Sequence, residues 1–255
     1  MSTTIVATMS TPNFRFKQFT IWHDKCAMKV GTDGVLLGAW CPEGKRILDV
    51  GTGSGLIARM LMQRCLEADV EGIDIDEAAV EQARENGVKA YLSRLQDWKT
   101  NDQSSITNHQ SSIINHKSSI INHKCYDLIV ANPPYFRNSL KNPDKGRELA
   151  RHTDSLSYEE LIHHSARLLT ENGQLALILP AEAENEVRLL AEKEGLFLTR
   201  VTRVFSKENK PARRVLLAFS HSPLAVSPTE DTLVLENEKG GRSAAYSELC
   251  KEFYL

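Results

Sequence analysis

The sequence predicts an α/β fold in which helices cover both faces of a mostly parallel sheet. From Lys45 onward, short apolar runs alternate with helical stretches, which is the pattern of βαβ units. The last two apolar runs, 198–205 and 214–220, are joined by a short polar segment that leaves no room for a helical crossover. We therefore expect an antiparallel hairpin at the end of the sheet. Residues 14–22 alternate apolar and polar side chains, which predicts a small β lead-in before the main fold.

The individual elements follow from the same patterns. The expected strands are 46–50, 70–73, 126–131, 174–179 and the two hairpin strands, and the expected helices are 56–64, 77–86, 157–169 and 181–194. Ser157 and Glu160 form a capping-box signal at the start of their helix, and Asn172-Gly173 marks its end. Gly195 ends the last helix.

Three parts of the chain are expected: a β lead-in over 1–44, a main domain over 45–222 and a polar, weakly patterned tail over 223–255. The 41% hydrophobic and 25% charged residues are typical of a folded globular protein. With 31 basic and 33 acidic residues, the net charge of -2 disfavours a bulk nucleic-acid binder, so such a partner would need local basic patches. Two candidates are 137–151 and 200–214.

Neither a membrane span nor an export signal is evident. The sequence contains no apolar run near the ~20 residues that a spanning helix requires, and its start lacks a basic region followed by an apolar stretch. The five cysteines are scattered without CxxC spacing, which indicates reduced thiols and no zinc site. We expect a cytoplasmic protein with no membrane partner and no metal.

Residues 104–124 are three copies of a seven-residue unit, SSITNHQ followed by two copies of SSIINHK. Ser, Thr and Asn are poor helix formers, and adjacent isoleucines give no clean coiled-coil seam. We interpret 99–124 as a surface insertion between two core strands. The recurring histidines at 109, 116 and 123 follow from the repeat and do not have the convergent spacing of metal ligands.

A glycine-rich loop, Leu48-Asp-Val-Gly-Thr-Gly-Ser-Gly55, lies between a predicted strand and a predicted helix. This context suits a nucleotide-like cofactor, but the third glycine comes one position too early for the dinucleotide fingerprint. About twenty residues later, the strand ends in Gly72-Ile-Asp-Ile-Asp76, where Asp74 could accept the hydroxyls of a ribose. The alternatives are a tight turn without a ligand and two acids at the start of a helix.

Together with the later Asn132-Pro-Pro-Tyr135, these motifs resemble class I S-adenosylmethionine-dependent methyltransferases of the amino-methylating branch. The resemblance implies a Rossmann-like fold with a seven-stranded sheet and S-adenosylmethionine as the cofactor. In this reading the glycine loop surrounds the methionine portion, Asp74 holds the ribose and Asp97 meets the adenine amine. The implied cofactor-binding residues are Asp49, Gly51, Thr52, Gly53, Gly55, Asp74, Ile75, Asp97, Trp98 and Asn132.

The tetrapeptide Asn132-Pro133-Pro134-Tyr135 follows a buried apolar run and therefore lies at the carboxyl end of a strand. The Asn132 amide oxygen and the Pro133 carbonyl could each accept one N–H of an aromatic amine, so that the lone pair of the nitrogen points at the methyl group. The two prolines stiffen the loop, and Tyr135 and Phe136 would stack on a flat substrate. The alternative is a proline-rich turn in which Asn132 bonds locally.

The lead-in over 16–40 and the segment 147–157 closely resemble the bacterial tRNA1(Val) adenine-37 N6-methyltransferase family. This resemblance implies a tRNA substrate, with Lys29 and Thr32 over the cofactor and with Arg147, Arg151 and His152 toward the RNA. A β-turn at Gly31 and Gly34 is the alternative for the lead-in. Other amine substrates, ribosomal RNA bases or a protein glutamine, stay open at this stage, as do a non-catalytic RNA-binding protein and a monomeric or weakly dimeric state.

Overall fold

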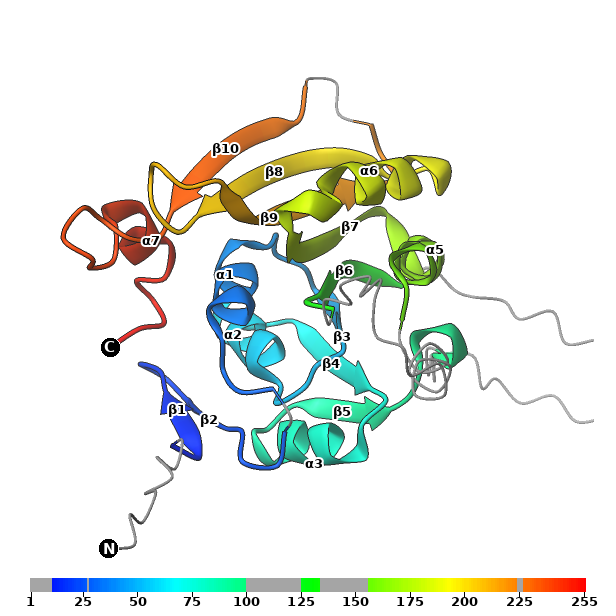
Figure 1. Ribbon diagram of the computed structural model, residues 1–255. Helices are drawn as coiled ribbons and strands as arrows, with labels where there is room; N and C mark the ends of the chain where they lie inside the picture. The colour runs from blue at the N-terminus through cyan, green and yellow to red at the C-terminus, as the bar shows by residue number, and fades with distance from the viewer. Residues whose placement is uncertain (1–10, 27, 100–124, 134–155, 224–226) are drawn as a thin grey trace, which may run out of the picture.

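The computed structural model describes residues 11–26, 28–99, 125–133, 156–223 and 227–255 of the 255-residue chain. Its central sheet is built from β3 (Arg46–Val50), β4 (Asp69–Asp74), β5 (Lys89–Leu92), β6 (Tyr126–Ala131), β7 (Leu169–Pro180), β8 (Phe197–Phe205), β9 (Ala212–Ser220) and β10 (Thr229–Val234). The strand order is β10-β8-β9-β7-β6-β3-β4-β5 (Figure 1). Strand β9 is antiparallel to both of its neighbours, and the other pairings are parallel.

The predicted fold class is confirmed, with eight strands in place of the expected seven. The eighth strand is β10, from the part of the chain interpreted as a weakly patterned tail. It pairs in parallel with β8 at the edge of the sheet and buries Leu233 against the core. An edge strand with one mostly exposed face carries too few apolar residues to give a strong sequence pattern.

The helices are α1 (Thr32–Trp40), α2 (Leu56–Arg64), α3 (Glu77–Glu85), α5 (Tyr158–Leu168), α6 (Glu184–Lys193) and α7 (Ala244–Leu249), with short 3-10 turns η1 (Leu95–Asp97) and η3 (Ala181–Ala183). The capping box predicted at Ser157 and Glu160 is present at the start of α5. This helix ends at Leu168, before the expected Asn172-Gly173, because β7 begins at the next residue. Among the described residues, no helix combines the length and the apolar character that a membrane span requires.

The two faces of the sheet belong to two hydrophobic clusters. Ile47 on β3 and Leu128 on β6 face the cluster that includes α1, α2 and α7, whereas Leu48 and Ile129 face the cluster that includes α5 and α6. This alternation is the period-two pattern of a sheet that is covered on both sides. The central strands are consequently buried on both faces, so their carboxyl ends form the edge at which a ligand can approach.

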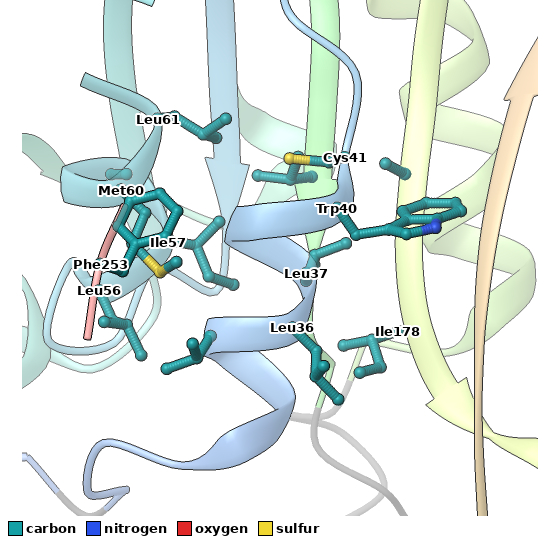
Figure 2. Packing of buried hydrophobic residues seen from close by; sticks show 14 of the residues in the cluster. Leu36, Leu37, Trp40, Cys41, Leu56, Ile57, Met60, Leu61, Ile178 and Phe253 are labelled. Atoms are coloured by element: carbon teal, nitrogen blue, oxygen red, sulfur yellow. The ribbon is translucent and has the colours of Figure 1, made fainter. Parts of the chain in front are cut away.

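Helix α1 lies inside the region expected as a β lead-in. Its Leu36, Leu37 and Trp40 belong to the same buried cluster as Ile57 and Met60 of α2, and Leu36 and Trp40 lie on the side of α1 toward Ile178 of β7 (Figure 2). The helices approach closely because Gly38 has no side chain, since a Cβ there would lie 2.7 Å from the Met60 sulfur. Close packing with α2 thus stabilises a helix whose glycines give it low intrinsic propensity.

The two ends of the described chain meet beside α2. The hairpin of β1 (Asn13–Arg15) and β2 (Thr20–Trp22) lies next to the C-terminal segment (Figure 1). Lys17 donates a backbone hydrogen bond to the Phe253 carbonyl over 2.9 Å, and the rings of Phe16 and Tyr254 stack with centroids 6.1 Å apart. Residues from the expected lead-in, main domain and tail therefore share one core cluster.

Candidate active site

Strand register brings the predicted motifs together at one edge of the sheet. Val50, the last residue of β3, pairs with Ile73 on β4 and with Ala131 on β6. Gly51, Asp74 and Asn132 therefore follow on three adjacent strands, whose spacing is about 4.8 Å. Beyond β3 the chain turns to β4 and β5 on one side, and it later returns to β6 and β7 on the other. This reversal of strand order is where open α/β sheets bind ligands.

A cavity of about 320 Å³ lies at this edge. Gly51 and Gly53 of the glycine loop form one wall, and Asn132 and Pro133 form another. Further lining comes from the lead-in, the end of β4, η1 and the start of α5, through Cys26, Met28, Asp74, Ile75, Asp76, Arg94, Gln96, Leu156 and Glu160. The volume is within the range of small-molecule sites.

The glycine loop has a left-handed backbone at each glycine, with φ of 69° at Gly51, 56° at Gly53 and 79° at Gly55. A Cβ on Gly51 or Gly53 would meet no atom within 4 Å, so these two residues face open space. A Cβ on Gly55 would lie 2.7 Å from a Val88 methyl group. The first two glycines thus allow a ligand to approach the backbone, whereas Gly55 serves packing at the start of α2.

Asp74 ends β4 and is held in place by two backbone amides. Gly53 donates to its Oδ2 over 2.9 Å, and Asp76 donates to its Oδ1 over 3.0 Å. Asp76 itself caps α3 by accepting from the Ala78 amide over 3.0 Å. A carboxylate has about four acceptor positions, so Asp74 can accept further hydrogen bonds from a ligand in the cavity.

Asp49 is fully buried behind the glycine loop. Its Oδ2 accepts from the Thr52 hydroxyl over 2.8 Å and from the Ala58 amide over 3.2 Å. Burial raises the pKa of Asp49 to about 7, and these hydrogen bonds only partly oppose it. Its Oδ1 has no hydrogen-bond partner in the described part of the chain. Thr52 is likewise buried, so both residues support the loop from behind.

Several residues expected at the cofactor lie beside the cavity or away from it. Lys29 and Thr32 do not line it: the Lys29 ammonium donates to the His23 carbonyl over 2.7 Å, and Thr32 begins α1. Asp97 lines a more open neighbouring hollow together with Ile75 and Arg94. Trp98 instead donates its indole N–H to the Tyr126 hydroxyl over 2.9 Å.

The residues predicted on the substrate side belong to two other segments of the chain. Pro134, Tyr135, Phe136, Arg147, Arg151 and His152 lie outside the described residues. Their roles in catalysis and RNA binding therefore stay predictions. In the described part of the chain, no group of three His, Cys, Asp or Glu side chains is arranged to hold a metal ion.

The cavity also contains residues that sequence reasoning missed. Glu160 could have been predicted from the sequence. A helix that follows a parallel strand begins at the carboxyl edge of the sheet, and the capping box of Ser157 and Glu160 marks where this helix begins. One Glu160 oxygen accepts from the Ser157 backbone amide over 3.0 Å, and this contact is the main cause of its lowered pKa. Cys26 and Met28 carry no such signal because they reach the cavity only through tertiary packing.

Comparisons with known proteins agree with this geometry. Residues 30–197 match the family model described as the methyltransferase small domain. A protein of Bacteroides fragilis is 43% identical over 97% of this chain and 99% of its own length, and one of Parabacteroides distasonis is 44% identical with the same coverage. Both relatives are named tRNA1(Val) (adenine(37)-N6)-methyltransferase.

A solved structure supports the fold. The crystal structure of a predicted O-methyltransferase from Agrobacterium tumefaciens aligns with a TM-score of 0.60 at 16% identity. The alignment covers 87% of this chain and 96% of that protein. At this low identity the likeness concerns the arrangement of strands and helices only.

Proposed function

The chain belongs to the tRNA1(Val) (adenine(37)-N6)-methyltransferase family, and we propose that it transfers a methyl group from S-adenosylmethionine to the N6 amine of adenine 37 in that tRNA. The observation that carries this proposal is the strand register. It puts the glycine loop after β3 next to Asn132 after β6, in one cavity. A methyl donor on the loop and an amine at Asn132 would therefore meet.

The lining of the cavity fits a cationic cofactor. Asp74, Asp76 and Glu160 bring three carboxylates to the wall, against the single guanidinium of Arg94 among the described lining residues. A negative cavity attracts the ammonium and sulfonium groups of S-adenosylmethionine. Gly51 and Gly53 leave the space that a methionine chain needs. When bound, the cofactor supplies an electrophilic methyl group on sulfur.

The catalytic role that we assign to this chain is to hold and orient the amine through two hydrogen bonds. The Asn132 side-chain oxygen and the Pro133 carbonyl each accept one N–H, which directs the nitrogen lone pair at the methyl group. Pro133 fixes its own φ and restricts Asn132 to extended backbone, so the backbone that carries both acceptors is stiff before the substrate arrives. Alignment and exclusion of water then supply most of the rate acceleration.

The RNA part of the proposal rests on the family and on the accessibility of the target base. Position 37 lies in a single-stranded anticodon loop, where a base can leave its stack without melting a duplex. Tyr135 and Phe136 would stack on it, while Arg147, Arg151 and His152 would contact the RNA backbone. A cytoplasmic location and a monomeric or weakly dimeric state belong to the same proposal.

Replacing Asn132 with Ala tests the mechanism. We expect Asn132→Ala to bind S-adenosylmethionine normally in calorimetry and to lose methyl transfer by about 10²-fold or more, the size typical for loss of one preorganised hydrogen-bonding group. Asn172→Ala is the matched control, because Asn172 is an exposed asparagine of β7 outside the cavity. Transfer is measured as N6-methyladenosine by nucleoside mass spectrometry. Near-normal transfer by Asn132→Ala would contradict the mechanism.

The choice of substrate needs a separate experiment. Unmodified tRNA1(Val), the same transcript with guanine at position 37, ribosomal RNA and a release factor are each incubated with labelled cofactor. We expect label only in the first. Label in ribosomal RNA or on a protein glutamine would keep the methyltransferase chemistry and overturn the tRNA substrate, whereas no label in any arm would overturn the proposed reaction.

A further inference from the structure

One side chain outside the cavity forms hydrogen bonds to both of the segments that build two of its walls. The lead-in contributes Cys26 and Met28 to the cavity, and the glycine loop contributes Gly51 and Gly53. Asn86, the C-cap residue of α3, forms hydrogen bonds to Trp22 in the lead-in and to Ser54 in the glycine loop.

The hydrogen bonds of Asn86 use its whole amide group. Its Oδ1 accepts from the Trp22 backbone amide over 2.9 Å, and its Nδ2 donates to the Trp22 carbonyl over 2.7 Å. The second N–H of Nδ2 donates to the Ser54 carbonyl over 2.8 Å. Asn86 is only 7% exposed, so water cannot readily replace these partners. One side chain therefore fixes the end of β2 relative to the centre of the glycine loop.

Each contact lies close to a cavity residue. Ser54 is flanked by Gly53 and Gly55, and the Gly53 amide donates to Asp74. On the other side, the lead-in runs from Trp22 to Cys26 and Met28, where it is held at a second point by Gln82. The fully buried Gln82 accepts from the Lys25 backbone amide over 2.9 Å. No hydrogen bond from the Gln82 side chain to the glycine loop occurs in the described part of the chain.

We propose that Asn86 is a positioning residue for cofactor binding, which sets the spacing between the lead-in and the glycine loop so that both walls contact one ligand. This proposal rests on the assignment of S-adenosylmethionine to the cavity. Asn86 touches neither the cofactor nor the substrate. It acts through Ser54 on one wall and through Trp22 on the other.

Asn86→Asp is the sharpest test because it keeps the shape of the side chain. An aspartate can still accept from the Trp22 amide, but its second oxygen would face the carbonyls of Trp22 and Ser54 without a proton to donate. The two walls should therefore separate. We expect Kd and KM for S-adenosylmethionine to rise about tenfold or more, the equivalent of one or two lost buried hydrogen bonds. At saturating cofactor, kcat should stay near the wild-type value.

Gln82→Met is the matched control on the same helix. It removes the hydrogen bond between the Lys25 backbone amide and the Gln82 side chain but leaves the contact between Asn86 and Ser54 intact, so cofactor affinity should fall much less than in Asn86→Asp. If Asn86→Asp does not fold, the same measurements are made on Asn86→Ser, which is a smaller change. Calorimetry is performed below the thermal midpoint of every variant, so that loss of folded protein cannot imitate loss of affinity.

Alkylation of Cys26 gives an independent readout of the lead-in. Cys26 is 6% exposed on the cavity wall, and we expect peptide mapping to show faster alkylation in Asn86→Asp and slower alkylation when the cofactor is added. A folded Asn86→Asp protein with wild-type Kd would overturn the inference. A wild-type protein that binds no S-adenosylmethionine would instead overturn the proposed function, so the two failures are distinguishable.

Discussion

At the scale of single residues, the buried carboxyl group of Asp49 is only partly stabilised by hydrogen bonds. Its carboxyl group is buried, two hydrogen bonds reach one oxygen, and the other oxygen has no partner among the described residues. The pKa is raised from its ordinary value of 3.8 to about 7. Between these values the folded protein keeps a proton that the unfolded chain releases. Asp49 therefore favours the folded state at low pH, and this contribution is lost as the pH rises through 7.

Asp49→Asn should remove this pH dependence, because an amide stays neutral throughout. We expect the stability of Asp49→Asn relative to the wild type to increase by an amount on the order of 2 kcal/mol between pH 5 and pH 8. Urea unfolding of both proteins without cofactor at the two pH values measures this difference. The other carboxylates are common to both proteins and cancel. An identical difference at both pH values would show that Asp49 is ionised across the range.

The residues of the site differ in how far the sequence could predict them. Gly51, Asp74 and Asn132 were predictable because each directly follows an apolar strand, and parallel strands present their carboxyl ends at one edge. Asn86 was not, since its partners Trp22 and Ser54 lie 64 and 32 positions away and an asparagine at the end of a helix has an ordinary local role. Local patterns identify groups that meet at an edge, but they do not reveal side chains that cross between elements.

At the scale of elements, the C-terminal segment is part of the core although its sequence is polar. Helix α7 and the residues after it bring Tyr246, Cys250 and Phe253 into the cluster beside α1 and α2. The ring of Phe253 is 2% exposed, and its carbonyl accepts from the Lys17 amide of the lead-in. Sparse apolar residues at irregular spacing gave no strong helical period here, so their burial depends on the surface that other elements provide.

Phe253→Ala should destabilise the protein by about 3–5 kcal/mol, the usual cost of removing a buried aromatic ring. Leu255→Ala is the matched control, because Leu255 is two residues further along and 78% exposed. We expect a negligible effect from that change. Urea or thermal unfolding of both variants measures the difference. Equal midpoints for the two variants would mean that the C-terminal segment does not pack on the core in solution.

Charge must be assessed at the scale of the whole molecule, because ion partners come from distant parts of the chain. The six basic residues of 200–214 looked like a phosphate-binding patch. In the structure, four of them pair with carboxylates of other segments: Arg200 with Asp231, Arg203 with Glu184 and Glu230, Lys207 with Glu236, and Arg214 with Asp33. Most of this local positive charge is therefore neutralised, and the patch is a weaker candidate for RNA contact than the sequence indicated.

The residues that flank 100–124 are also held by contacts with distant parts of the chain. Before the segment, Trp98 donates its indole N–H to the Tyr126 hydroxyl over 2.9 Å, two residues after Gln96 of the cavity wall. After the segment, the Cys125 amide donates to the Leu168 carbonyl over 2.9 Å at the amino end of β6. Asn132 follows the other end of this strand. The five steps of about 3.3 Å between the six residues of β6 put that end about 17 Å from the first residue of the strand.

Replacing 100–124 with a short glycine-serine linker should consequently leave Kd for S-adenosylmethionine and the thermal midpoint unchanged, because no described contact of the cavity depends on that segment. Calorimetry and thermal unfolding measure the two quantities. Trp98→Ala in the linker protein is the contrasting variant, since it removes the flank contact and buried aromatic surface, and it should lower the midpoint. If the linker alone weakened cofactor binding, the segment would contribute to the cavity, and its interpretation as a surface insertion would be wrong.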